Sequence, residues 1–208
     1  VGSLMLIRDG TTYNYLKITG FTNSTTVSAT SQKTIDSSQQ NKDLYTWSEG
    51  EFGLHRSYPR AITFHEQRLV FAGSINETQK IWFSKSADYE NFDIDYNSQT
   101  ADDGFNRIIA SSTNDSILWL FSDEVLFIGC TDSVWIAKPS NNSAGLSNTD
   151  IGLKRQIAFG CEWVDPVYAD NSPFYLQRGK QKIRNINYTA NQGKFTTEDV
   201  TIRSDHIT

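Results

Sequence analysis

Arg68-Leu-Val-Phe-Ala-Gly-Ser74 and Lys80-Ile-Trp-Phe-Ser-Lys-Ser86 are the two runs that decide the fold of this chain. Both are rich in β-branched and aromatic residues, which favour strands. The short polar segment 75–79 between them predicts a turn. Two adjacent antiparallel strands of this kind are typical of one blade edge of a β-propeller.

Further strand-like runs follow at close intervals, separated by Asp, Asn, Gly and Ser. Together with the two opening runs, they span residues 61–64, 68–74, 80–86, 108–111, 116–122, 124–131, 133–138, 154–159, 173–177 and 181–188. No apolar pattern with the period of a helix interrupts them. The sequence therefore predicts an all-β fold of antiparallel meanders, of sandwich or propeller type.

Three hairpins can be predicted within this series. Residues 118–122 pair with 125–129, residues 127–130 pair with 134–137, and residues 174–177 pair with 182–185. The first two hairpins share a strand and form a three-stranded meander, whereas a propeller blade has four strands. Residues 69–73 and 126–129 each end an apolar run in glycine, which is a hint of an internal repeat.

The first 46 residues have a different composition, rich in Thr, Ser, Asn and Gln. Alternating runs at 13–19 and 25–30, with turn residues at 20–24 between them, predict antiparallel strands with one solvated face. Residues 37–42 are polar and predict a connector. We therefore expect residues 1–46 to be the end of a β-rich domain and residues 47–208 to form a partial propeller-like domain.

Composition, net charge and cysteine content limit the classes of protein to which the chain can belong. Aromatic residues make up 12% of the 208 residues and apolar residues 38%, so the rings are expected to supply much of the core. The net charge of −5 argues against nonspecific binding of nucleic acid. An acidic channel wall would nevertheless suit DNA that passes through a channel without binding to it. Cys130 and Cys161 are expected to be buried free thiols. No long apolar run predicts a membrane span, and no intact signal peptide is recognised.

An ordered set of residues between 47 and 206 resembles a known family. The set comprises Trp47, Tyr58-Pro59, Phe64, Gln67–Gly73, Ile81–Ser84, Asn91-Phe92, Ile117–Leu120, Gly129, Thr131, Gly160, Pro166, Asp199–Thr201 and His206. In this order the residues resemble the tail nozzle family (tail tubular protein B) of short-tailed bacteriophages. No single element is diagnostic, and the order is what carries the resemblance.

The resemblance implies a longer protein that contains a β-propeller and belongs to the virion. It implies a homo-oligomeric ring that meets other tail proteins, the adaptor and the fibres, and carries DNA towards the host. The absence of an initiator methionine and the ending at Thr208 agree with a piece of such a protein. Two features depart from the family: the chain is short for a closed propeller of several blades, and its two cysteines are unexpected.

Motifs for metal binding are incomplete. The run His65-Glu-Gln-Arg-Leu69 begins like a zincin helix but lacks the second histidine. Residues 93–98 with Asp102-Asp103-Gly104 resemble a calcium loop, although Ser98 stands where the turn needs glycine. We expect a solvated acidic loop there, no metal site and no cofactor.

Motifs for catalysis are likewise not recognised, and the chain is not expected to be an enzyme. The three histidines, His55, His65 and His206, are scattered, so no nucleophile–base pair can be assigned. A pair of carboxylates for glycoside hydrolysis stays open. Its candidates by proximity alone are Glu49, Glu51, Asp102 and Asp103.

Surface contacts have their own candidates. Trp82, Trp119, Trp135 and Trp163 lie in apolar runs and are expected in the core, whereas Trp47 and Tyr58 are flanked by polar residues and could contact a ligand. The basic cluster consists of Arg178, Lys180, Lys182 and Arg184. It predicts a solvated hairpin tip, or a contact with DNA phosphates or an acidic subunit.

The leading hypothesis is a structural component of a viral tail, part of a DNA ejection conduit. The alternative is a propeller that binds or hydrolyses host surface glycan. A direct DNA binder is the weakest hypothesis because of the acidic balance.

Overall fold

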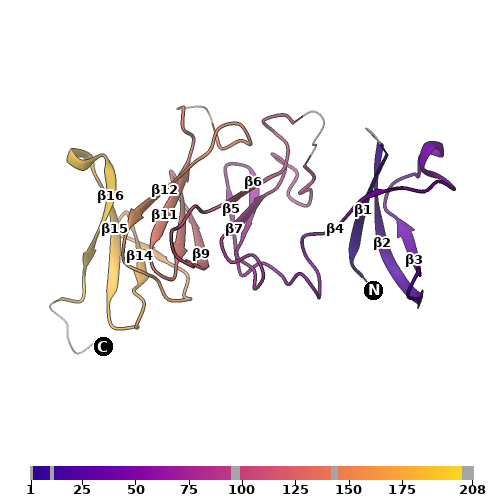
Figure 1. Ribbon diagram of the computed structural model, residues 1–208. Coiled ribbons are helices and arrows are strands. Elements are labelled where there is room, and N and C mark those ends of the chain that lie inside the picture. Colours follow the sequence, from indigo (N-terminus) through magenta and orange to yellow (C-terminus); the bar gives the residue numbers. More distant parts are fainter. Residues whose placement is uncertain (1, 10–11, 95–98, 142–144, 203–208) are drawn as a thin grey trace. The chain divides into compact units, whose positions relative to one another are not determined.

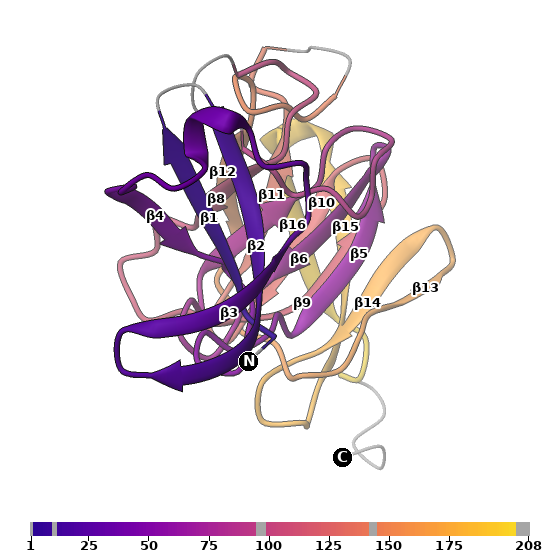
Figure 2. The ribbon, with the colours of Figure 1, turned by 90° about the vertical axis from the view of Figure 1, so that its right-hand side faces the viewer.

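The chain is all-β in the computed structural model, which describes residues 2–9, 12–94, 99–141 and 145–202 (Figure 1). Its strands form four antiparallel sheets of four strands each, and Figure 2 shows the same sheets after a quarter turn. In the described ranges, helix is limited to two three-residue 3-10 turns, η1 (Ser37–Gln39) and η2 (Ala190–Gln192). The predicted all-β fold of antiparallel meanders is thus confirmed.

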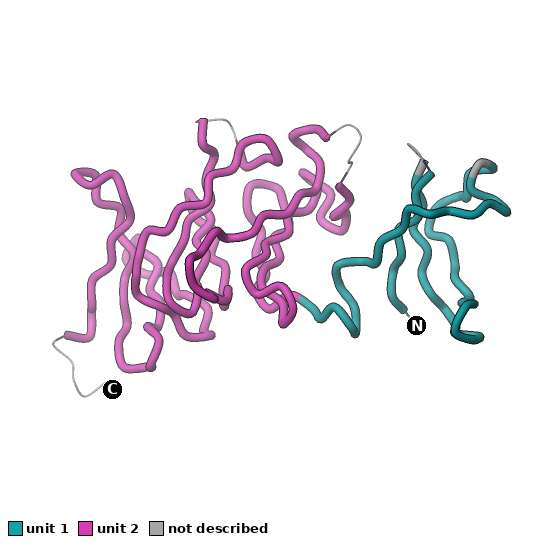
Figure 3. Tube along the Cα trace, in the orientation of Figure 1, with its two compact units in different colours: residues 1–58 teal, residues 59–208 magenta. Residues whose placement is uncertain are grey.

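Two compact units make up the chain, residues 1–58 and residues 59–208 (Figure 3). The division lies between Tyr58 and Pro59 rather than near residue 46, where the change in composition placed it. The reason is the strand β4 (Thr46–Glu49), which pairs antiparallel with β1 (Leu4–Asp9) and puts Trp47 opposite Ile7. Trp47 therefore belongs to the N-terminal sheet and not to the propeller-like part.

The N-terminal sheet has the strand order β3-β2-β1-β4. Its two remaining strands are β2 (Thr12–Asn23) and β3 (Thr26–Ser31). β2 continues through residues 20–23, which the sequence predicted to be a turn. These residues stay paired with β3, and the register of the pairing shifts twice along them. The turn itself is shorter, and the Thr25 amide donates to the Asn23 side-chain oxygen across it (3.0 Å).

The second unit consists of three consecutive four-stranded meanders. The first sheet contains β5 (Ala61–His65), β6 (Arg68–Ala72), β7 (Lys80–Phe83) and β8 (Phe105–Ile108). The second contains β9 (Ile117–Ser122), β10 (Leu126–Cys130), β11 (Val134–Lys138) and β12 (Gly152–Ile157). The third contains β13 (Val167–Ala169), β14 (Ser172–Leu176), β15 (Ile183–Thr189) and β16 (Lys194–Asp199).

In each of these sheets the strands follow their order in the sequence, as in a propeller blade. All three predicted hairpins occur, β9 with β10, β10 with β11 and β14 with β15. β6 and β7 also pair as the opening runs predict. Gly73 follows β6 and Gly129 lies in β10, so the glycine repeat marks the second strand of two successive blades. The unit is a partial β-propeller.

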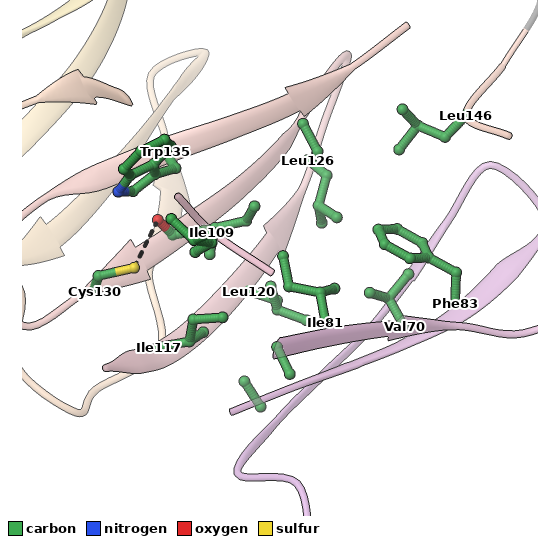
Figure 4. Packing of buried hydrophobic residues seen from close by; sticks show 14 of the residues in the cluster. Val70, Ile81, Phe83, Ile109, Ile117, Leu120, Leu126, Cys130, Trp135 and Leu146 are labelled. Atoms are coloured by element: carbon green, nitrogen blue, oxygen red, sulfur yellow. Dashed lines mark hydrogen bonds between the residues drawn. The ribbon is translucent and has the colours of Figure 1, made fainter. Parts of the chain in front are cut away.

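Apolar side chains fill the spaces between the blades. The first core lies between β5–β8 and β9–β12, and Figure 4 shows Val70, Ile81 and Phe83 of one blade facing Leu120 and Leu126 of the other. A second core lies between β9–β12 and β13–β16. It is built from Trp119, Phe127, Val134, Ile136, Ile157, Cys161, Tyr175 and Ile186. The middle blade is therefore buried on both faces, which explains why β10 is apolar at consecutive positions.

A glycine in the middle blade makes room for the largest of these side chains. A Cβ atom on Gly129 would lie 2.0 Å from an atom of the Trp119 ring, which is fully buried. The register between β9 and β10 also shifts between Gly129 and Cys130. The indole ring thus lies directly on the backbone of the neighbouring strand, where only glycine fits.

In the N-terminal unit β1 and β4 were not predicted, and in the second unit three strands differ from the prediction. β8 begins at Phe105 and ends at Ile108, where the predicted strand began. β13 and β16 were not predicted at all, since β13 is exposed along its whole length and β16 is mostly polar. Edge strands of this kind have too little apolar alternation to be recognised in the sequence.

Candidate functional site

The partial propeller has two ends, which we name by the strands that lead to them. The even end carries the loops that follow the even-numbered strands β6, β8, β10, β12 and β14. Backbone hydrogen bonds join several of these loops. The Thr131 N–H donates to the Ser116 carbonyl oxygen (3.0 Å), and the Arg178 N–H donates to the Gly160 carbonyl oxygen (2.9 Å). The odd end carries the turns that follow the odd-numbered strands. There the Glu66 carboxylate after β5 accepts the Leu146 N–H of the β11–β12 loop.

The predicted basic cluster lies at the even end, on the β14–β15 hairpin. Arg178 forms an ion pair with Asp132, and Lys182 forms one with Asp199 (3.0 Å). The hydroxyl of Thr201 and then Lys182 lower the pKa of the Asp199 carboxyl to about 2. Two of the four cations therefore have carboxylate partners within the chain.

The other two cations of the cluster differ from each other. Arg184 is buried rather than at a solvated tip, because its guanidinium lies 3.7 Å from the centre of the Phe159 ring and its Nε donates to Gln177 (2.6 Å). Lys180 is exposed in the hairpin turn with a positive φ of 62°. Of the four basic side chains, only that of Lys180 has no hydrogen-bond acceptor, carboxylate or aromatic ring near its charge among the described residues.

The aromatic candidates Trp47 and Tyr58 are both exposed. The exposed fraction is 62% for Trp47, on β4, and 59% for Tyr58, at the end of the N-terminal unit. Both side chains are thus accessible to a ligand, as their polar flanks predict.

The tryptophans predicted to be buried divide into two groups. Trp82, Trp119 and Trp135 are buried, which confirms the prediction for these three. Trp163 is 64% exposed, so its assignment to the core is wrong. It lies in the loop between β12 and β13, and the Arg60 guanidinium is 5.9 Å from the centre of its ring.

His65 has a different partner from the one that a zincin motif would give. It lies on strand β5, and its Nδ1 is 2.8 Å from the Ser122 hydroxyl at the end of β9. Its Nε2 is 3.9 Å from the Glu66 carboxylate. Burial lowers the pKa of the His65 imidazole, against the opposing effect of Glu66. Sequence spacing gave no signal for this contact, which joins residues 57 positions apart and ties two blades together.

The acidic loop between β7 and β8 surrounds an arginine. The Arg68 guanidinium donates to four backbone carbonyl oxygens, those of Ser84 (2.5 Å), Ala101 (2.6 Å), Asp103 (2.9 Å) and Asp102 (3.3 Å). Arg68 thus holds this part of the loop by its backbone.

The carboxylates of this loop are also engaged. Asp103 accepts the Thr100 N–H (2.8 Å), which lowers the pKa of the Asp103 carboxyl, and it forms an ion pair with Lys85 (3.1 Å). Positions 95–98 of the segment that resembles a calcium loop lie outside the described residues. Within the described ranges, no group of three His, Cys, Asp or Glu side chains is placed to hold a metal ion.

A second buried acid organises the even end. Asp115 is 1% exposed and accepts hydrogen bonds from the Asp132 N–H (2.8 Å), the Thr131 hydroxyl (3.2 Å) and the Ser133 hydroxyl. The Trp135 indole N–H in turn donates to the Ser133 hydroxyl (2.7 Å). The network locks the β8–β9 loop to the β10–β11 turn. The sequence marked 131–133 only as a turn and gave no sign of its acidic partner.

Two of the four carboxylates named as candidates for glycoside hydrolysis have a cationic partner. Glu49 is paired with Arg56 (3.2 Å) and Asp103 with Lys85, so each carboxylate faces a cation. Cys130 and Cys161 are buried and free, as predicted, and burial raises the pKa of both thiols.

A comparison with known protein families finds no match, and a comparison with curated protein sequences finds none either. Among the described residues, no helix has the length and apolar character needed to cross a membrane.

Proposed function

We propose that this chain is a structural component of a viral tail, a nozzle or tubular protein that forms part of the DNA ejection conduit. The observation that carries the proposal is that buried polar side chains link loops and blades to each other. Arg68 holds a loop, Asp115 joins two loops, and His65 joins two blades. Side chains of the kind that perform chemistry in enzymes serve here to fix the shape of the propeller.

The assembly and the role in this proposal come from the ordered resemblance to the tail nozzle family. Under this proposal the chain belongs to the virion, in a homo-oligomeric ring that meets an adaptor and fibres. DNA passes through such a ring without being held. The ion pairs of Arg178 and Lys182 fit this role, since they leave few cations on the basic hairpin for phosphate groups.

The test is electron microscopy and light scattering of the purified protein, produced with whatever natural sequence flanks these residues. We expect a particle of several copies with a central hole, because heterologous contacts that close make rings. A species that stays monomeric at every accessible concentration would refute the proposal.

The second candidate function is binding of host surface glycan, with or without hydrolysis. The exposed Trp47 and Tyr58 favour it, because flat aromatic faces stack on sugar rings. A glycan array and a reducing-sugar assay test it. Binding that is lost on Trp47→Ala would support glycan recognition, and turnover lost on replacing a single carboxylate would make the chain an enzyme.

A further inference from the structure

The third blade has one open apolar face. Tyr175 of β14 lies in the core that the second and third blades share. Because side chains alternate along a strand, Phe174 and Leu176 lie on the opposite face. Val167 of β13 pairs with Phe174, and its side chain is 65% exposed. Ile183 of β15 pairs with Leu176 in the same way. Four apolar side chains therefore share a face of the third blade that no other blade covers in the described structure.

The first blade has an open apolar face as well. Ala61 of β5 lies in the core that the first and second blades share, so Ile62 and Phe64 lie on the opposite face. Both are 60% exposed. Phe71 of β6 pairs with Ile62 and extends the apolar row across the sheet. Tyr89 of the β7–β8 loop meets Phe64 edge to face, with 5.1 Å between the ring centres, and covers it only in part.

The sequences of both end blades are those of strands covered on two faces. In the middle blade, β10 is apolar at consecutive positions and buried at each of them. The second strands of the end blades are also apolar at consecutive positions, residues 69–72 in β6 and 174–176 in β14. There, however, buried positions alternate with half-buried ones. Continuous apolar runs are typical of strands that are buried on both faces, so each end blade lacks one cover.

The chain already uses a contact of the required kind twice. The first blade packs on the second, and the second on the third, each time through an apolar core (Figure 1). The third blade leaves open the face that a following blade would cover, and the first blade leaves open the face that a preceding blade would cover. A closed propeller typically has about four to eight blades. Three blades are too few to close, whereas two copies of the chain supply six.

We propose that two copies of this chain close a six-bladed propeller. The open face of the third blade of each copy packs on the open face of the first blade of the other copy. The dimer has twofold symmetry, and its two interfaces are equivalent. Val167 and Ile62 lie near the start of the first strand of their blades, and they meet in each interface. This inference goes beyond the proposed function and does not rest on it, because it concerns how the blades are completed.

The first experiment measures the mass of the whole protein against concentration by light scattering and sedimentation velocity. We expect a species of twice the mass of the chain. Ile62→Asp and Val167→Asp each place a charge in an apolar contact and should weaken the dimer by at least about tenfold. Val164→Asp is the matched control, because it makes the same change at a residue that is 52% exposed in the loop before β13. This variant should dimerise like the wild type.

The second experiment identifies the faces that meet. Ile62→Cys and Val167→Cys are treated with a short bismaleimide, which the two native thiols escape because they are buried. A mixture of the two variants should give a covalent dimer, because the closed dimer places residue 62 of one copy beside residue 167 of the other. Either variant alone should give little. Cross-linking of Ile62→Cys to itself, and not to Val167→Cys, would refute the pairing of the faces.

The outcomes distinguish this inference from the proposed function. A wild type that stays monomeric, or a dimer that persists in both aspartate variants, overturns the inference. Growth into chains of indefinite length overturns the closure at six blades. A ring of more than two copies that neither variant affects leaves the proposed function standing and refutes this inference. A discrete dimer that both variants dissociate, with no larger ring, supports this inference and counts against the proposed ring of a viral tail.

Discussion

Replacing Arg68 by methionine should loosen the loop between β7 and β8 at a large cost in stability. The Arg68→Met change keeps most of the side-chain length and removes the guanidinium that four carbonyl oxygens share. Two of these carbonyls belong to the buried residues Ser84 and Asp103. A buried acceptor without a partner costs about 1–3 kcal/mol, so the two together cost about 2–6 kcal/mol. Apolar contact of the new side chain with Phe105 offsets about 1 kcal/mol of this.

The expected net loss is about 1–5 kcal/mol, which corresponds to a fall in the melting temperature of about 2–20 °C. Denaturant unfolding measures the loss, and hydrogen exchange locates it. The amides of Ser86 and Thr100, which donate to Asp102 O (2.9 Å) and to the Asp103 carboxylate, should exchange faster than in the wild type. Arg68→Lys is the control, because an ammonium keeps the charge but lacks the planar fork, and it should give an intermediate loss. Unchanged stability together with unchanged exchange of both amides would refute the reasoning.

Three further predictions concern the cores. Gly129→Ala places a Cβ against the buried Trp119 ring and should destabilise the fold by about 3 kcal/mol or more in urea unfolding. His65 stays neutral in the fold because burial lowers its pKa, whereas the unfolded chain takes up a proton near pH 6.5. Stability should therefore fall below about pH 6.5 by up to about 1.4 kcal/mol per pH unit, and His65→Gln should remove this slope. Cys130 and Cys161 should resist an alkylating reagent at pH 8 until denaturant is added, because burial raises their pKa.

Each of these predictions has a control. Gly20→Ala adds a Cβ only 3.5 Å from Ser28, an ordinary contact, and should change stability by less than about 0.5 kcal/mol. An equal effect at Gly20 and Gly129 would contradict the steric argument. A pH slope that persists in His65→Gln would assign it to another group, and rapid alkylation of the native protein would show that the thiols are accessible.

The sequence predicted the central strands because their burial leaves a local signal. β10 is apolar at consecutive positions since both of its faces are covered, and the hairpins around it have turn residues of the expected kind. Trp163 shows the limit of this signal. It stands between Glu162 and Val164, whereas Trp119 stands between two leucines, and it follows the end of β12 in a loop, where it is 64% exposed.

The polar contacts could not be predicted because their partners are distant in sequence. Arg68 is 16 residues from Ser84 and 35 from Asp103, and His65 is 57 from Ser122. A solvated acidic loop was expected near position 102, but Asp103 is buried, and the Arg68 guanidinium donates to the backbone carbonyls of Asp102 and Asp103. Only the path of the backbone between β7 and β8 brings the two together.

The middle blade has a consequence for how the protein is made. One face of β9–β12 meets strands that have already left the ribosome, but the face with Trp119 and Val134 meets only residues that are translated later. A nascent chain that pauses before Val167 therefore presents an uncovered apolar sheet to solvent. That interval is when the chain would be most prone to aggregate or to engage a chaperone, and rare codons in residues 140–166 would lengthen it.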